Sequence, residues 1–72
     1  MRYNYDKLLG LIKEKYGSNK NLSVALGLSQ HSLSMKLNNK HEFKQSEISK
    51  IAKLLDIPNS KIQLYFFTKE VQ

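Results

Sequence analysis

The apolar residues of the chain recur at helical spacing in five stretches, which polar or turn-forming residues separate. The first stretch, residues 5–16, carries its inward apolar side chains at Tyr5, Leu8, Leu9, Ile12 and Tyr16. Because these positions are three or four residues apart, they fall on one face of an α-helix. Residues 1–4 precede the pattern, and we expect them to form a frayed arm.

Two shorter helices are predicted over residues 19–26 and 30–37, on either side of a glycine. Ser18 and Ser29 are good N-caps, because a serine hydroxyl accepts from the free N–H groups of a first helical turn. Gly27 ends the first of the two helices, since the left-handed conformation costs glycine little. The expected inward residues are Leu22, Ala25, Leu26, Leu33 and Leu37. This arrangement is typical of a helix-turn-helix.

A fourth helix is predicted over residues 45–55 and a fifth over residues 59–66. Pro58 lies between them, where it disfavours helix at the preceding residue and suits the first turn of the next helix. Phe43 precedes the fourth helix, and we expect it to plug the core from the loop. The predicted fold class is therefore all-α, a compact bundle of about five short helices in one domain, residues 1–72.

The end of the fifth helix has more apolar side chains than a small core can hold, at Leu64, Tyr65, Phe66 and Phe67. Two interpretations stay open for this group. The residues can close the five-helix core, or some of them can form a homodimer contact, because surplus apolar surface near a terminus often meets a partner.

The charge of the chain favours a polyanionic partner. Twelve lysine and arginine residues face six acidic ones, for a formal charge of +6 in 72 residues. Lys36, Lys40, His41 and Lys44 follow one another closely after residue 35, and only Glu42 opposes them. Arginine is the usual bidentate reader of guanine, and the chain has only one, which weakens the argument for DNA.

Several classes of function are disfavoured. The chain has no cysteine, hence no disulfide or thiolate metal site, and His31 and His41 have no third ligand at metal spacing. His31-Ser32 with Asp56 or Glu47 would suggest a hydrolase, but a chain of this size has little room for a substrate pocket and an oxyanion hole. We therefore expect that the protein is not an enzyme and that it binds no metal ion or cofactor. No apolar run suits a signal peptide or membrane span, so we expect a cytoplasmic protein.

Residues 18–40 resemble the helix-turn-helix of phage repressors and Cro proteins, which belong to the lambda-repressor-like group. The matching positions are Leu22, Ser23 (where that group usually has alanine), Gly27, Leu28, Ser29, Leu33 and Asn38-Asn39-Lys40. Residues 43–48 and 65–68 also resemble a subset of small phage regulators, which includes modulators and antirepressors of lysogeny switches. The resemblance covers about residues 5–67, and it implies a lambda-repressor-like bundle.

In such motifs the N-terminal part of the second helix meets base edges in the major groove. The resemblance assigns base reading to Gln30, His31, Ser34 and Met35. Gln30 can pair with adenine, His31 can donate to guanine, and Met35 can lie against a thymine methyl. The expected phosphate contacts are Ser18, Asn19, Asn21, Ser29, Ser32, Asn39 and Lys40. An ordinary solvated first turn is the competing interpretation of these polar residues.

Two interpretations of the function remain. In the first, the protein is a phage-type transcriptional regulator that occupies operator DNA as a dimer. In the second, it is a modulator or antirepressor that binds the opposing repressor through the same helix-turn-helix face, at Gln30, His31, Met35 and Lys36. Lys36 departs from the family, which usually buries an aliphatic residue three positions after Leu33. A methionine on a helix surface is an adaptable protein contact, which favours the second interpretation.

Overall fold

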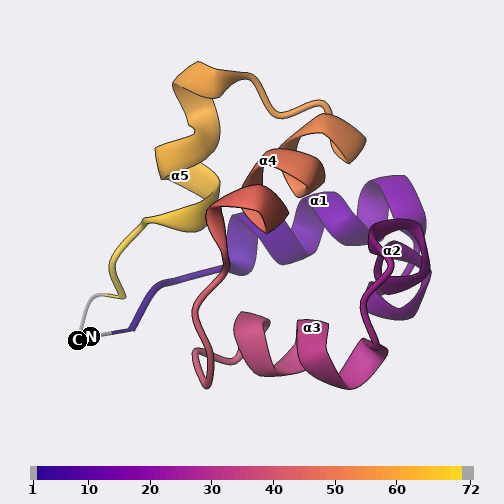
Figure 1. Ribbon diagram of the computed structural model, residues 1–72. Coiled ribbons are helices and arrows are strands. Elements are labelled where there is room, and N and C mark those ends of the chain that lie inside the picture. Colours follow the sequence, from indigo (N-terminus) through magenta and orange to yellow (C-terminus); the bar gives the residue numbers. More distant parts are fainter. Residues whose placement is uncertain (1, 71–72) are drawn as a thin grey trace.

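Helices make up most of the computed structural model, which describes residues 2–70 (Figure 1). Along the chain they are α1 (Asp6–Tyr16), α2 (Asn19–Leu26), α3 (Gln30–Leu37), α4 (Gln45–Leu54), the short 3₁₀ helix η1 (Asn59–Lys61) and α5 (Ile62–Phe66). Helix α1 contacts α2 and α5, while α2 also contacts α3 and α4. None of the helices within residues 2–70 has the length and apolar character needed to cross a membrane.

The bounds of α2 and α3 coincide with the ranges expected from the sequence. Ser18 Oγ accepts from Asn21 N at 3.2 Å, and Ser29 Oγ accepts from Ser32 N at 3.0 Å, so both serines cap their helices. Gly27 has a φ of 76°, a left-handed conformation that lets the chain turn sharply between the two helices. The predicted helix over 59–66 is divided, because the chain leaves Pro58 in a 3₁₀ turn before α5 begins.

The core collects apolar side chains from every α-helix and from the turn after α4. Its buried members are Tyr5, Leu8, Ile12, Leu22, Leu26, Leu33, Leu37, Ile51, Ala52, Leu55, Ile57 and Phe66. Burying a leucine, isoleucine or phenylalanine side chain contributes about 1.5–3 kcal/mol, so a core of this size supports a stable fold only while it stays well packed. Phe43 is half-buried and packs against this core from the loop.

The inward face of α2 differs from the prediction. Ala25 is exposed, whereas Ser23 is buried with 2% of its surface accessible. The Ser23 hydroxyl donates to the Lys20 carbonyl at 2.6 Å, which satisfies its hydrogen-bonding need in the core. Because α2 packs on α1, α3 and α4 together, its buried face is broader than one apolar stripe and admits a small polar residue.

The expectation of a frayed N-terminal arm is wrong for the described residues from Arg2 onward, and Met1 lies outside them. Tyr3 forms an antiparallel β-bridge with Lys69, and Asn4 N donates to Thr68 O at 2.6 Å. The described terminal segments, residues 2–4 and 68–70, therefore lie side by side, as Figure 1 shows. Periodicity could not reveal this contact, because it joins residues at opposite ends of the sequence.

The apolar group at the end of α5 is divided between the core and the surface. Phe66 is buried with 1% of its surface accessible, so it closes the core, and it is unavailable for a homodimer contact. Tyr65 is half-buried, whereas Leu64 and Phe67 are 43% and 41% exposed. A helix of five residues has one inward face, which leaves Leu64 and Phe67 for the homodimer hypothesis.

Candidate functional site

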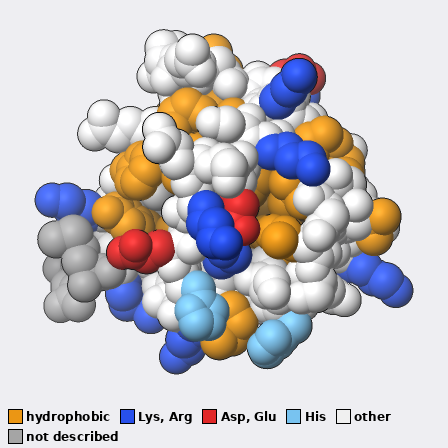
Figure 2. Space-filling view, viewed as in Figure 1, with side chains coloured by type: hydrophobic (Ala, Val, Ile, Leu, Met, Phe, Trp, Pro, Cys, Tyr) orange, Lys and Arg blue, Asp and Glu red, His pale blue; other side chains and the backbone are white. Residues whose placement is uncertain are grey.

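Helix α3 lies at the edge of the molecule with one side open to solvent (Figure 1). Gln30 and His31 are exposed, while Ser34 and Met35 are half-buried. Leu33 and Leu37 anchor the opposite side of the helix in the core. The structure thus brings the four predicted base-reading residues onto one helix, but two of them are partly covered. Figure 2 shows histidine side chains, in pale blue, on the face over α3 and the loop after it.

The residues predicted to contact phosphate are largely engaged within the protein. Asn21 Nδ2 donates to Tyr16 O at 2.7 Å and so ties the end of α1 to α2. Ser18 and Ser29 act as helix caps, although a capping hydroxyl keeps a proton to donate. Ser29 uses that proton for the Ser32 hydroxyl, at 2.9 Å. Lys40 is exposed and Asn19 is half-buried.

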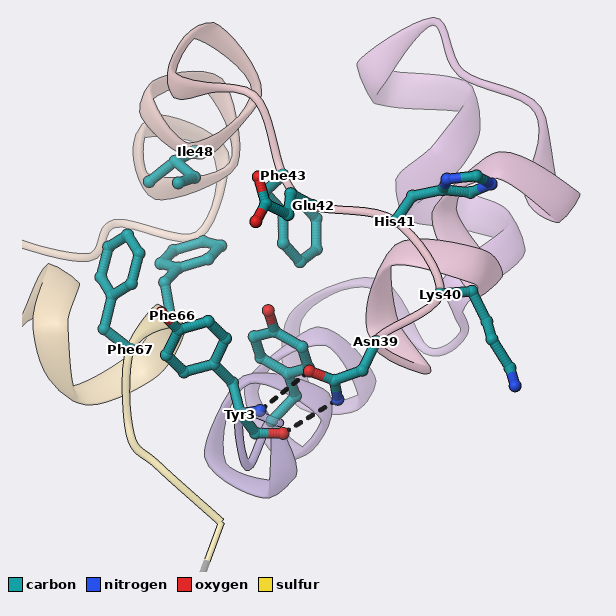
Figure 3. Close-up of a pocket in the computed structure, with 10 residues that line it drawn as sticks. Tyr3, Asn39, Lys40, His41, Glu42, Phe43, Ile48, Phe66 and Phe67 are labelled. Atoms are coloured by element: carbon teal, nitrogen blue, oxygen red, sulfur yellow. Dashed lines mark hydrogen bonds between the residues drawn. The ribbon is translucent and has the colours of Figure 1, made fainter. Parts of the chain in front are cut away.

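The side chain of Asn39 has a structural role that the sequence did not indicate, although an asparagine suits the turn after α3. Its φ of 62° is left-handed, and its side chain pairs with the backbone of Tyr3 in two hydrogen bonds. Tyr3 N donates to Asn39 Oδ1 at 2.8 Å, and Asn39 Nδ2 donates to Tyr3 O at 3.0 Å (Figure 3). The Asn39 amide thus holds the N-terminal segment, and the interpretation of Asn39 as a phosphate ligand does not fit this geometry.

Lys36 is buried rather than displayed. Its side chain is 11% exposed, and Nζ lies 2.8 Å from Oε1 of Glu47, whose side chain is 14% exposed. Nζ also donates to Glu42 O at 3.4 Å. The prediction of Lys36 as a partner-binding residue therefore does not fit the structure, because its charge is neutralised inside the protein. The departure from the family at this position is explained by Glu47, a partner eleven residues away.

Glu47 also caps α4. Its Oε1 accepts from Lys44 N at 2.8 Å in a capping box. Burial raises the pKa of the Glu47 carboxyl, but hydrogen bonds from Lys36 and from the Lys44 backbone, with the charges of both lysines, outweigh burial and lower it. Glu47 is therefore ionised at neutral pH and holds the end of α3 against the start of α4.

A second surface lies around aromatic side chains from both ends of the chain and from the loop before α4. The Phe43 ring makes edge-to-face contacts with Tyr5 and Phe66, at centroid distances of 5.6 and 5.5 Å. Tyr3 meets Phe67 in the same way at 5.7 Å. We call this the aromatic surface, and its members are Tyr3, Tyr5, Phe43, Ile48, Phe66 and Phe67. The sequence indicated Phe43 and Phe67 separately, but not that they line the same cavities.

The aromatic surface borders open cavities. One cavity, of about 310 Å³, is lined by the whole surface together with residues 39–42 at the end of α3 (Figure 3). Another, of about 580 Å³, lies between α4 and the η1–α5 segment, and Phe43, Ile48 and Phe67 line it as well. Burial raises the pKa of the Tyr5 phenol, with smaller contributions from Tyr3 and Glu42, so Tyr5 stays neutral at physiological pH. Cavities with mixed polar and apolar walls beside an exposed phenylalanine suit contact with a protein side chain.

The described residues 2–70 contain no group of three or more histidine, cysteine or acidic side chains that could hold a metal ion. What they present is a helix-turn-helix whose outer face is polar, next to an aromatic surface with cavities. These two surfaces are the candidate contact sites of the protein.

Comparison with known proteins identifies the family of the chain. Residues 1–69 match the family described as "Protein of unknown function (DUF739)", and the chain belongs to that family. A search of curated proteins finds no match. The chain is also similar to the solution structure of the modulator of repression (MOR) of the temperate bacteriophage TP901-1 from Lactococcus lactis. The identity is 42%, the TM-score is 0.83, and the similarity covers 100% of this chain and 97% of that one.

This similarity confirms the predicted resemblance to small phage switch modulators and the predicted all-α fold. The matched protein is named as a regulator of repression and not as an enzyme, in agreement with the class expected for this chain. Its name does not specify DNA or a repressor protein as the target, so the two interpretations of the function remain to be compared on the geometry.

Proposed function

We propose that this protein regulates a phage lysogeny switch by binding the opposing repressor protein and so modulating repression. The similarity to a phage modulator of repression supports the regulatory class. The bacterial cytoplasm, where repressor and operator meet, is the compartment in which this activity would take place.

The aromatic surface is the observation that carries the proposal. Phe67 is 41% exposed and lines both cavities. Aromatic side chains are enriched at the centres of protein interfaces, where they fill pockets and exclude water. DNA offers little that an exposed phenylalanine could bury against outside the minor groove or unstacked bases.

The helix-turn-helix face is less well equipped for DNA than its motif suggests. Lys36 is neutralised by Glu47, and the side chains of Asn21 and Asn39 are occupied within the protein. Lys20 and Lys40 are the lysines that remain exposed between residues 18 and 40. Bidentate arginine contacts are the commonest specific readers of guanine, and α3 has no arginine.

Titration of the protein with the repressor of the same phage tests the proposal. We expect Phe67→Ser to weaken repressor binding about tenfold or more, because a buried aromatic anchor contributes over 1.4 kcal/mol. Val24→Ser is the matched control, since Val24 is 75% exposed on α2 and lies outside the aromatic surface. Calorimetry reports both affinities. Failure of the unaltered protein to bind the repressor at all would contradict the proposal.

The same titration separates the two partner-binding surfaces. A repressor seated on the α3 face would lose affinity with Met35→Asp, and with Gln30→Ala or His31→Ala, while tolerating Phe67→Ser. A repressor seated on the aromatic surface would respond in the opposite way. Residues 39–41 line the cavity and follow α3 directly, so a large partner can span both surfaces, and both sets of variants would then weaken binding.

Operator DNA is the second candidate target, and the charge of the helix-turn-helix favours it. Residues 18–40 contain three lysines and no acidic residue, and Gln30 and His31 are exposed at the start of α3. If α3 reads bases, Gln30→Ala and His31→Ala should each cost about 1–3 kcal/mol and relax sequence preference, whereas Lys40→Ala should weaken all sequences alike. A gel-shift series in low salt with promoter DNA decides this point.

A homodimer through Leu64 and Phe67 remains part of the proposal for operator binding. Both residues are exposed, and Phe67 also belongs to the aromatic surface proposed for the repressor. Self-association and repressor binding would therefore compete. Sedimentation over a range of concentrations tests the dimer, and a monomer at high concentration would exclude it.

A further inference from the structure

The ion pair between Lys36 and Glu47 holds the backbone on both sides of Phe43. Lys36 Nζ donates to the carbonyl of Glu42, at 3.4 Å, which belongs to the peptide group before Phe43. Glu47 Oε1 accepts from Lys44 N, at 2.8 Å, which belongs to the peptide group after it. The two side chains are joined at 2.8 Å. One ion pair therefore fixes both peptide groups that set the direction of the Phe43 side chain.

The chain around Phe43 has little regular structure of its own. Residues 41–44 lie outside the helices, between the end of α3 and the start of α4. The Phe43 ring nevertheless packs edge-to-face on Tyr5 and Phe66, and it lines both cavities of the aromatic surface. Figure 3 shows the ring directed from this loop into the cavity, with Phe66 beside it. A small rotation of the backbone at Phe43 would therefore change the shape of both cavities.

The chemistry of the pair suits positioning better than stabilisation. Desolvating two charges offsets much of their attraction, so a buried ion pair adds little stability over apolar residues of similar size. It does supply directed hydrogen bonds, which an aliphatic side chain at position 36 could not offer to the Glu42 carbonyl. The pair also belongs to two elements, since Lys36 lies on α3 and Glu47 on the first turn of α4.

We propose that Lys36 and Glu47 are positioning residues, which hold Phe43 in place and so set the shape of the aromatic surface from within the helix-turn-helix. The binding consequence of this inference rests on the proposed function, whereas its structural consequence does not. It further implies that a change at the end of α3 is felt at the aromatic surface, because the same lysine belongs to both.

The Lys36→Met variant tests the structural consequence. Methionine keeps an unbranched side chain of similar size but donates no hydrogen bond. We expect the NMR resonances of the Phe43, Tyr5 and Phe66 rings to shift while circular dichroism stays helical. Lys36→Arg, which keeps charge and donors, should restore the native ring resonances. Lys50→Met is the matched control, because Lys50 Nζ donates to the Leu26 carbonyl at 3.2 Å, away from Phe43.

Unchanged ring resonances in a folded Lys36→Met protein would overturn the inference. If that variant does not fold because it leaves the Glu47 carboxylate unpaired, the double variant Lys36→Met with Glu47→Gln takes its place. A glutamine oxygen can still accept from Lys44 N and preserve the start of α4, while the Glu42 carbonyl loses its donor. We expect the Phe43 ring resonances to shift in this double variant as well, and native resonances would overturn the inference.

A double-mutant cycle on repressor binding tests whether the pair acts through Phe43. We expect Lys36→Met to weaken binding about tenfold in the native background and to have little further effect once Phe43 is replaced by leucine. Additive effects of the two changes would mean that Lys36 acts by another route. If the unaltered protein does not bind repressor, the proposed function fails, and the ring resonances still decide the inference.

Discussion

At the scale of single residues, polar side chains perform structural tasks that their exposure alone would not suggest. Asn39 is the clearest example, because its backbone is left-handed and its amide pairs with both backbone groups of Tyr3. An asparagine tolerates that backbone conformation better than most residues and offers a donor and an acceptor together. It therefore connects the end of α3 to the N-terminal segment.

Replacing Asn39 separates these two contributions. Asn39→Ala should lower the free energy of unfolding by about 2–3 kcal/mol, because it loses two hydrogen bonds and because alanine tolerates the left-handed backbone less well than asparagine does. Asn39→Gly should lose less, about 1–2 kcal/mol, since glycine keeps the backbone conformation without strain. Urea denaturation of both variants measures the difference. Equal losses would show that the left-handed backbone contributes nothing.

Glu47 gives the fold a dependence on acid. Its pKa is lower in the folded protein than the ordinary value of 4.5, so its ionised form stabilises the fold above that pH. This stabilisation is lost as the pH falls from there through the lowered pKa. We expect the difference in unfolding free energy between the native protein and Glu47→Gln to be largest near neutral pH and to shrink in acid. A constant difference across that range would contradict the assignment.

At the scale of elements, the bounds of the helices were predictable from residues near their ends, whereas the burial of side chains that depends on other helices was not. The bounds of α2 and α3 follow from Ser18, Gly27 and Ser29, because a cap or a glycine turn acts on backbone only three or four residues away. The predicted inward place of Ala25 was wrong, since the broad contact face of α2 depends on three other helices. The burial of Lys36 could not be predicted either, because its partner belongs to the next helix.

The candidate site shows the same division between local and long-range signals. The exposed start of α3 at Gln30 and His31 follows from the helical period around Leu33 and Leu37. The aromatic surface, by contrast, joins Tyr3, Phe43 and Phe67, which are far apart in sequence. No period relates these positions, so only the folded chain shows that they form one surface.

Two glycines allow a matched test of the helices. An added Cβ would meet open space at both Gly10 and Gly27, but Gly10 lies within α1 and Gly27 has a φ of 76°. Gly10→Ala should raise the free energy of unfolding by about 0.5–1 kcal/mol, because alanine is the better helix former. Gly27→Ala should lower it by about 1–2 kcal/mol through strain in the left-handed conformation. Thermal unfolding should therefore move in opposite directions, and a shared sign would contradict this account.

At the scale of the whole molecule, charge and apolar surface have different consequences for binding. The formal charge of +6 attracts any polyanion, whereas a partner on the aromatic surface would be held by the exclusion of water from apolar side chains. The two kinds of attraction differ in their response to salt. Counterion release makes DNA affinity fall steeply as salt rises, while apolar contact depends on it much less.

Titrations at several salt concentrations should separate the two targets. We expect binding to unrelated DNA to weaken with a logarithmic slope of about −0.9 for each phosphate neutralised. Repressor affinity should change only a few-fold over the same range, since the aromatic surface contributes no charge of its own. Comparable slopes for DNA and repressor would indicate that the lysines, and not the aromatic surface, dominate both.

The meeting of the two chain ends has a consequence for redesign. Tyr3 bridges Lys69, and Glu70 N donates to Arg2 O at 3.0 Å, so a short linker could close the backbone into a ring. New ends could be opened between Pro58 and Asn59, which are both exposed. Such a circular permutant would leave the helix-turn-helix of α2 and α3 uncut. A protein fused to the new termini would then lie beside η1 and α5, and nothing besides the linker would be attached at the former termini.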